Sequence, residues 1–263
     1  MADGIMDFLL GWLLLFSPFW ALLIISVIFS LITNLAYKFF TDQHVMKQLK
    51  EDIKKSQEEM KKIKDNPSKV MEIQKKSMEK NFEYMKQSMK PTLITFIPII
   101  LIFGWLTANL AFDPITPDSQ FNTTLTFKDG FTGNAVIELP DGIESVNGNE
   151  QEIKEAECAG AFFSTSKCGK ATFMLKVAEE GEYPLTFAYD NETEKTNVLV
   201  TKQQKYLPPE KLTPKSDYLS KINVEQNKLI AMNLFGWKVG WLGTYIILSL
   251  IISLGMRKLM NLY

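Results

Sequence analysis

Histidine and cysteine are scarce in this chain of 263 residues, which contains one histidine and two cysteines. The histidine, His44, has no cysteine or carboxylate cluster around it at metal-ligand spacing. The sequence also lacks a GxxxxGK(S/T) phosphate loop, a GxSxG nucleophile elbow and an HExxH zinc motif. We therefore expect neither an ATP-driven pump nor an enzyme, and we expect no cofactor and no metal.

Charged residues are almost absent from three apolar stretches, 7–38, 91–112 and 235–256. The hydrocarbon core of a bilayer is about 30 Å thick, and roughly 20 helical residues cross it. Each stretch is long enough for this, so the sequence predicts three transmembrane helices with the lipid bilayer around them.

The first stretch is longer than one span needs, and Ser17-Pro18 offers a break within it. Serine suits the position before a helix and proline suits its first turn, so we expect a lead-in or interfacial helix over 1–17 and the span over 18–38. A cleaved signal peptide fits poorly, because the stretch is long and its start carries acidic residues in place of basic ones.

The two long connections between the spans differ in charge. Residues 38–90 carry 14 lysines against nine acidic residues, a net charge of +5, whereas 113–235 carry 12 lysines against 19 acidic residues, a net charge of −7. Basic flanks favour the cytosolic side of a membrane. We expect a multi-pass protein of the plasma membrane with 39–90 and the tail 257–263 in the cytosol, and with the N-terminus and 113–234 outside.

The acidic connection reads as a small β-domain. Short runs of alternating apolar and polar residues, separated by turn residues, predict an antiparallel β-sandwich over 113–205, followed by a linker over 206–234. Two sequons make Asn122 and Asn191 candidate glycan acceptors. Cys158 and Cys168 lie ten residues apart and are a candidate disulfide in an oxidising exterior, with free buried thiols as the alternative.

The lysine-rich segment 39–90 predicts two helices around the turn signal Asn66-Pro67. Apolar residues recur at helical spacing in both arms, which is typical of an antiparallel coiled coil. Methionine is frequent among them, and such flexible side chains can repack around varied apolar partners, although an irregular structural seam is an equal alternative. The lysines form a solvated face or dock on RNA or anionic lipid. The methionines that we assign to a substrate-receiving hairpin are Met46, Met60, Met71, Met78, Met85 and Met89.

Small polar side chains occupy the halves of the spans that we place nearer the cytosol. They predict a polar groove for a substrate, or else the ordinary contacts by which membrane helices pack together. In the third span Lys238 stands between two tryptophans, which favours an interfacial residue over a charge in the groove. The candidate groove residues are Ser26, Ser30, Thr33, Asn34, Thr95, Ser249 and Ser253.

The runs "TDQHVMKQLKEDIKK", "EYMKQSMKP" and "FGWKVGWLGTYIILSLIISLGMRKLMNLY" together resemble the archaeal YidC-like insertases. They belong to a superfamily with bacterial YidC and a subunit of the endoplasmic-reticulum membrane complex. The resemblance covers the spans and the hairpin, and it implies a polar groove open to cytosol and lipid. It also implies that the chain helps nascent or newly made short-tailed membrane proteins enter the bilayer without ATP. The ribosome and accessory membrane subunits are the further partners it implies. Bacterial YidC has an arginine in its groove; here Lys38 is the nearest basic residue, and Lys238 is the other candidate.

The sequence thus predicts an α-helical integral membrane protein with three transmembrane helices, a cytosolic antiparallel coiled-coil hairpin and an extracellular small β-sandwich domain. Two other functions stay open: a membrane-anchored envelope or adhesion module that acts through its outer β-domain, and a small cation channel, which the lack of membrane carboxylates disfavours. The expected order is 1–17 lead-in, 18–38 span, 39–90 hairpin, 91–112 span, 113–205 β-sandwich, 206–234 linker, 235–256 span and 257–263 tail.

Overall fold

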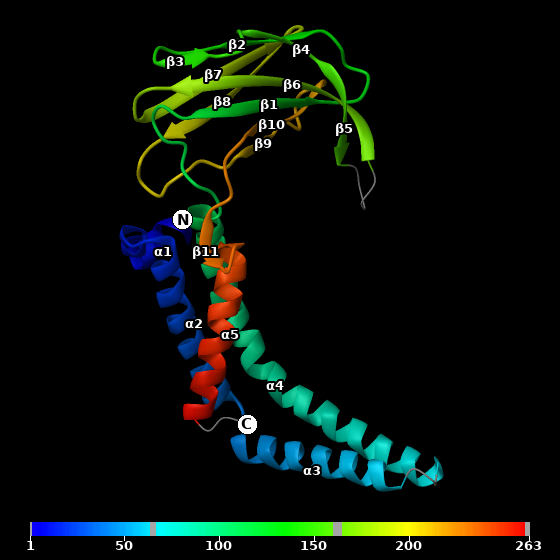
Figure 1. Ribbon diagram of the computed structural model, residues 1–263. Coiled ribbons are helices and arrows are strands. Elements are labelled where there is room, and N and C mark those ends of the chain that lie inside the picture. The colour runs from blue at the N-terminus through cyan, green and yellow to red at the C-terminus, as the bar shows by residue number, and fades with distance from the viewer. Residues whose placement is uncertain (1, 64–66, 160–164, 261–263) are drawn as a thin grey trace. The chain divides into compact units, whose positions relative to one another are not determined.

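The computed structural model describes residues 2–63, 67–159 and 165–260 (Figure 1). Backbone contacts divide the chain into two compact units, one of residues 1–106 with 230–263 and one of residues 107–229. We call the first the helical unit and the second the β-rich unit.

The helical unit begins with helix α1 (Ala2–Leu10) and the 3-10 helix η1 (Gly11–Leu15), which end where α2 (Pro18–Phe40) starts. Ser17 has extended backbone angles and Pro18 opens the helix, so the chain breaks at the predicted place. The 23 residues of α2 span about 35 Å at 1.5 Å per residue, enough to cross a bilayer.

Two helices follow α2. Helix α3 (Gln43–Lys62) is capped by Asp42, whose carboxylate accepts from the backbone N–H groups of His44 and Val45 at 2.9 and 3.1 Å. Helix α4 (Pro67–Leu110) runs for 44 residues and continues through Pro91 and Pro98. The predicted boundary between hairpin and second span at 90/91 therefore falls inside one unbroken helix.

The third apolar helix, α5 (Trp241–Leu259), begins six residues later than predicted. The residues before it form a hairpin of β11 (Ile230–Leu234) and β12 (Trp237–Gly240). Phe235 and Gly236 at its turn have φ angles of +51° and +92°, which a helix cannot contain. Among the described residues, α2, α4 and α5 are long and apolar enough to span a membrane.

The β-rich unit consists of two antiparallel sheets around one core (Figure 1). Phenylalanines and Tyr189 from both sheets fill the core. The first sheet has the order β3-β6-β1-β10-β9 with β5 on β6, and the second has the order β4-β2-β7-β8. Their bounds are β1 (Gln120–Phe127), β2 (Asn134–Glu138), β3 (Ile143–Ser145), β4 (Glu150–Glu152), β5 (Lys154–Ala159), β6 (Thr165–Val177), β7 (Gly181–Tyr189), β8 (Glu192–Val200), β9 (Glu210–Leu212) and β10 (Leu219–Val224).

The predicted linker 206–234 contains three strands, β9, β10 and β11. Its β10 pairs with β1 inside the first sheet, so the β-domain extends well beyond residue 205. Tyr206, at the start of the predicted linker, is held in place as well: its hydroxyl accepts from Ala111 N–H at 2.9 Å and donates to the carbonyl of Thr107. These bonds occupy backbone groups at the C-terminal end of α4, where a helix leaves carbonyls without partners.

Glu192 fastens the β7–β8 turn to the loop before β10. Its carboxylate accepts from the Ser216 hydroxyl, from Asp217 N–H at 3.1 Å and from the Tyr189 hydroxyl at 3.2 Å. The hydrogen bond from Ser216, followed by that of Asp217, holds the pKa of Glu192 below its usual range. Burial raises the pKa of the Tyr189 phenol to about 12. Of the two candidate glycan acceptors, Asn191 lies next to Glu192 and is exposed, whereas the side chain of Asn122 donates to the Glu225 carboxylate at 3.0 Å.

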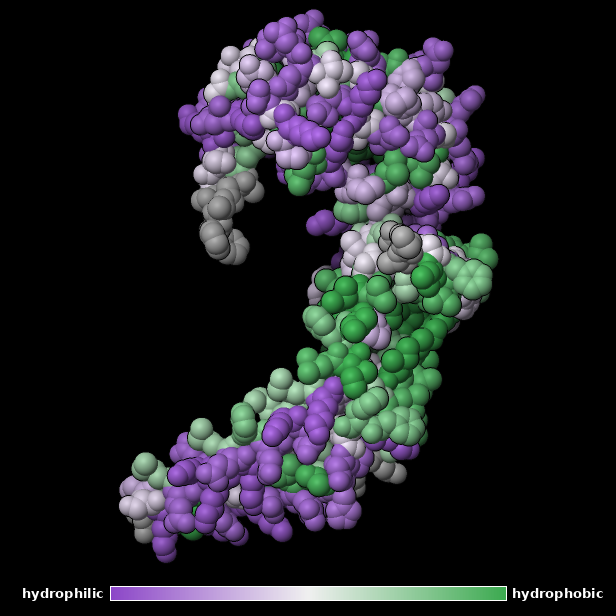
Figure 2. All heavy atoms as spheres, turned by 180° about the vertical axis from the view of Figure 1, so that it is seen from behind, coloured by the Kyte–Doolittle hydropathy of each residue, from purple (hydrophilic) through white to green (hydrophobic). Residues whose placement is uncertain are grey.

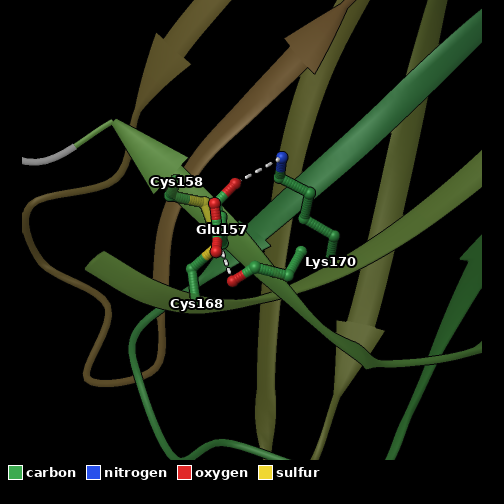
Figure 3. The surroundings of a disulfide bond; sticks show 5 residues. Glu157, Cys158, Cys168 and Lys170 are labelled. Atoms are coloured by element: carbon green, nitrogen blue, oxygen red, sulfur yellow. Dashed lines mark hydrogen bonds between the residues drawn. A yellow bond between two sulfur atoms is a disulfide. The ribbon is translucent and has the colours of Figure 1, made fainter. Parts of the chain in front are cut away.

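Cys158 and Cys168 form a disulfide between β5 and β6, with their Cα atoms 5.9 Å apart (Figure 3). The two residues are not direct cross-strand partners, because Cys168 faces Ala156 and Cys158 faces Ser166. The Lys170 side chain donates to the Glu157 carbonyl at 3.3 Å beside the bridge. The disulfide therefore links the two neighbouring strands β5 and β6 covalently.

Candidate functional site: a polar cavity among the spans

Helices α2 and α5 are joined by two side-chain hydrogen bonds one helical turn apart. The Ser30 hydroxyl donates to the Ser249 carbonyl and the Asn34 amide donates to the Ser253 hydroxyl, both at 3.4 Å. Both pairs are 219 residues apart, so the two helices run parallel and in register. Ser30 and Asn34 are 1% exposed. These four predicted groove residues therefore lie in the contact between two helices.

Within the described residues of the helical unit, three buried hydroxyls make no hydrogen bond: those of Ser26, Thr244 and Tyr245. The register that pairs Ser30 with Ser249 places Ser26 level with Tyr245. A buried polar group without a partner costs about 1–3 kcal/mol. The contact between α2 and α5 thus contains polar atoms that its own hydrogen bonds do not satisfy.

A cavity of about 240 Å³ opens between the three helices at the end where α5 finishes. At ~30 Å³ for each water in the liquid, this is room for roughly eight waters or a short piece of polypeptide. Thr33 and Thr95, two of the candidate groove residues, line it. Their hydroxyls donate to backbone carbonyls of their own helices, at 2.5 Å to Phe29 and 3.1 Å to Pro91, which leaves the oxygens free to accept. The full lining is Thr33, Tyr37, Tyr84, Ser88, Pro91, Thr92, Thr95 and Arg257.

Arg257 supplies the positive charge of this cavity. Its guanidinium lies 5.0 Å from the centre of the Tyr37 ring, a distance at which cations are attracted to aromatic faces. Neither lysine that we considered from the sequence lines the cavity: Lys38 is exposed, and Lys238 lies in β12 at the opposite end of α5. The sequence places Arg257 just after a span, and only the register of α2 with α5 brings it to Tyr37.

Aromatic rings pack between the three helices on the side of the cavity nearer the start of α5. Phe103 of α4 meets Tyr245 and Trp241 of α5 at ring-centre distances of 5.2 and 5.9 Å, and Phe29 of α2 lies 6.0 Å from Tyr245. In the same part of the unit, the Trp105 indole donates to the Asp7 carboxylate at 2.8 Å, which ties α1 to α4. Aromatic rings therefore surround the buried hydroxyl of Tyr245, and the open polar cavity lies farther along the helices.

The methionines of the hairpin divide between two environments. Met46 is fully buried and Met60 is half-buried, whereas the four methionines of α4 are 50–71% exposed. The face of α4 that turns toward α3 carries Ser77, which is buried, and Lys80, which pairs with Asp52 at 2.7 Å. The α4 methionines lie on another face of that helix, so they do not form the seam with α3 that their spacing predicted. The exposed ones are Met71, Met78, Met85 and Met89.

Figure 2 shows hydrophobic residues gathered over the spans and hydrophilic residues over the arms that α3 and the first half of α4 form. No cluster of three or more His, Cys, Asp or Glu side chains that could hold a metal occurs within the described ranges. The arrangement offers hydroxyl oxygens as acceptors, a guanidinium as donor and positive charge, and exposed apolar surface beside them.

Three membrane-length helices, a polar cavity among them and a separate β-rich domain define an integral membrane protein of mixed architecture. The model of a family described as integral membrane protein EMC3/TMCO1-like matches residues 3–136, and the chain belongs to that family. The family is part of the YidC/Oxa1/Alb3 insertase-related superfamily, which confirms the superfamily that the sequence resembles. The match ends within β2, so α5 lies beyond it. Comparisons with curated proteins and with solved structures found no match.

Proposed function

We propose that the protein is a membrane protein insertase, which lets short-tailed membrane proteins enter the bilayer through the polar cavity between α2, α4 and α5. The observation that carries this proposal is the hydroxyl-lined cavity with Arg257 at its edge, in a chain of the insertase-related superfamily. The substrates are nascent or newly made membrane proteins, and the archaeal branch of the superfamily remains our prediction.

The energetics need no ATP. A charged side chain at the bilayer centre costs about 2.5–3.5 kcal/mol on insertion scales, and a wet cavity shortens the apolar path over which the polar tail meets this cost. We call the inserted substrate the passenger. Each Leu or Ile near the centre of its transmembrane helix contributes about −0.3 to −0.6 kcal/mol to the free energy of insertion. Ten such residues release roughly 3–6 kcal/mol, which covers one charge. The protein then lowers a barrier, and the passenger supplies the free energy.

The passenger's tail would bind through its backbone and its charges. Its N–H groups can donate to the hydroxyl oxygens of residues such as Thr33 and Thr95, and an acidic side chain in the tail is attracted by Arg257. The Tyr37 ring holds the guanidinium at the cavity edge. The four residues that join α2 to α5 keep the cavity's walls together.

The proposal includes an orientation in the plasma membrane. The lysine-rich arms and the end of α5 that carries Arg257 lie in the cytosol, and the N-terminus and the β-rich unit lie outside. The exposed methionine face of α4 receives the apolar passenger, since flexible thioethers adapt to varied surfaces. The lysines of the two arms contact ribosomal RNA, and accessory membrane subunits are further partners.

Reconstituted liposomes test the proposal. Purified protein receives a single-span substrate with a short N-terminal tail, and protease protection of the tail is scored. Thr33→Val with Thr95→Val keeps shape and removes two cavity hydroxyls, each worth about 1 kcal/mol, so we expect a roughly tenfold to thirtyfold lower insertion rate. Thr244→Val is the matched control, because Thr244 is buried outside the cavity. Tail protection no greater than in protein-free liposomes would refute an insertase.

The second candidate, an envelope or adhesion module, is favoured by a cavity of about 780 Å³ within the β-rich unit, lined largely by polar residues of β1, β10 and the segments beside them. The ends of this unit allow a clean deletion, because Leu229 N–H donates to the Ala111 carbonyl at 3.1 Å. A short Gly/Ser linker can therefore replace 113–228. An insertase keeps tail protection without the unit, whereas a module that acts through it loses its activity.

A further inference from the structure

The β11–β12 hairpin ends in aromatic side chains that the described protein leaves uncovered. Phe235 at the turn is as exposed as a free side chain, at 107%, and Trp237 is 66% exposed. Phe235 also has a φ of +51°, a conformation that is a genuine outlier for a bulky residue. Asparagine or glycine would satisfy this turn at lower cost. Folding alone gives no reason for a phenylalanine here.

The hairpin has one apolar and one polar face. Leu234 pairs with Trp237 and Met232 pairs with Val239, and because alternate residues of a strand share a face, these four side chains lie on one side. The pair between them, Asn233 with Lys238, lies on the other. A structure with an apolar face, a polar face and a lysine on the polar side suits the boundary between water and lipid.

The apolar face is fixed against the start of a span. Val239 is 5% exposed, and a Cβ placed on Gly243, in the first turn of α5, would meet its Cγ1 at 2.7 Å. The absence of a side chain at Gly243 thus lets β12 pack closely on the helix. Since α5 starts at Trp241, directly after β12, the hairpin stands where that span leaves the bilayer.

The geometry points to the β11–β12 hairpin as an interfacial anchor that lies on the lipid surface. Phe235 and Trp237 enter the boundary between headgroups and acyl chains, where amphipathic aromatic rings concentrate. Lys238 extends toward the phosphates of the headgroups. The anchor sets how deep α5 sits in the bilayer, and it stands independently of the insertase proposal, since it needs only that α5 spans a membrane.

Cysteine labelling in liposomes of the purified full chain tests the anchor, because both native cysteines are bonded to each other. The variant Phe235→Cys is compared with Asn191→Cys, which lies at the exposed β7–β8 turn, and with Leu250→Cys, on the exposed middle of α5. A charged, membrane-impermeant maleimide is added from the side that labels Asn191→Cys. We expect labelling at 235 to be at least tenfold slower than at 191, and labelling at 250 to be undetectable.

Trp237 reports whether lipid is what covers the hairpin. The emission of Trp237 is the difference between the fluorescence of the wild type and that of Trp237→Phe. It is measured in two kinds of vesicle, one with lipids brominated near the headgroup and one with lipids brominated near the chain end. We expect several-fold stronger quenching by the shallow bromines. Gly243→Ala should displace Val239, restore labelling of Phe235→Cys and leave Leu250→Cys protected. Equal labelling rates at 235 and 191 would overturn the anchor. Protection of 235 without quenching of Trp237 by brominated lipid would also overturn it, because a second copy of the chain and not lipid would then cover the hairpin.

Discussion

Arg257 allows the insertase proposal to be tested through charge alone. A spherical cavity of about 240 Å³ is roughly 8 Å across, and two unit charges at that separation interact by about 2 kcal/mol at an effective dielectric constant of about 20. This energy corresponds to about thirtyfold in rate. We therefore expect Arg257→Gln to slow insertion of a passenger with one aspartate in its tail by up to about thirtyfold.

The assay compares three passengers that differ at one tail position, which is Asp, Asn or Lys. Initial rates of tail protection are measured in liposomes with wild type, Arg257→Gln and Arg257→Lys. Arg257→Gln should leave the Asn tail within about threefold and should speed the Lys tail, since a like charge has been removed. Arg257→Lys keeps the charge but loses the planar group that lies over Tyr37, and it should give an intermediate rate for the Asp tail.

Equal slowing of all three passengers by Arg257→Gln would refute this reasoning, because a purely structural role of Arg257 has no preference for tail charge. Tyr37→Leu provides a second check. It removes the ring under the guanidinium while keeping an apolar side chain, and the loss of a cation–π contact of about 0.5–2 kcal/mol should weaken the preference for the Asp tail without reversing it.

Three further predictions concern stability. Ser26→Ala should raise the unfolding free energy in detergent by about 1 kcal/mol, because it removes a buried hydroxyl without a partner, whereas Ser30→Ala should lower it; equal effects in thermal melts would contradict the assigned contacts. The pKa of Glu192 is lowered by folding, so its contribution to stability is present above the ordinary pKa of a glutamate and is lost as the pH falls through the lowered pKa of the folded state; acid unfolding of Glu192→Gln should show a weaker pH dependence, and an unchanged profile would exclude these Glu192 contacts as stabilising. Replacing Cys158 and Cys168 by serine opens a loop with a sequence separation of ten residues and should lower the unfolding free energy of the β-rich unit by about 3 kcal/mol. Denaturant unfolding followed by far-ultraviolet circular dichroism measures this loss. No loss would mean that the disulfide does not stabilise the pairing of β5 with β6.

Sequence periodicity predicted the helices and the β-rich domain well because both depend on local patterns. Apolar runs of span length identified α2, α4 and α5, and Ser17-Pro18 located the break before α2. The start of α5 was missed because "FGWKVG" runs without a break in the apolar pattern into the span, and the left-handed turn at Phe235-Gly236 sets it apart. A hydropathy pattern carries no information on such a turn.

The candidate site was predicted only in part, because small polar residues have two uses in a membrane. Ser30 and Thr33 stand three residues apart on α2, yet the first joins α2 to α5 and the second lines the cavity. Which use applies depends on how far each side chain is rotated toward the neighbouring helix. The role of Arg257 depends on the pairing of α5 with α2, a contact between segments far apart in the sequence that no local pattern reveals.

The parallel pairing of α2 with α5 has a consequence for biosynthesis. Ser30 and Ser249 are 219 residues apart, so the walls of the cavity can close only after α5 has left the ribosome. Closing so long a loop carries an entropic cost that grows with the logarithm of its length. The β-rich unit reduces it, since its fold brings Ala111 and Leu229 within one hydrogen bond and removes the residues between them from the loop. A domain that takes no part in the cavity thereby shortens the loop that has to close when α5 meets α2.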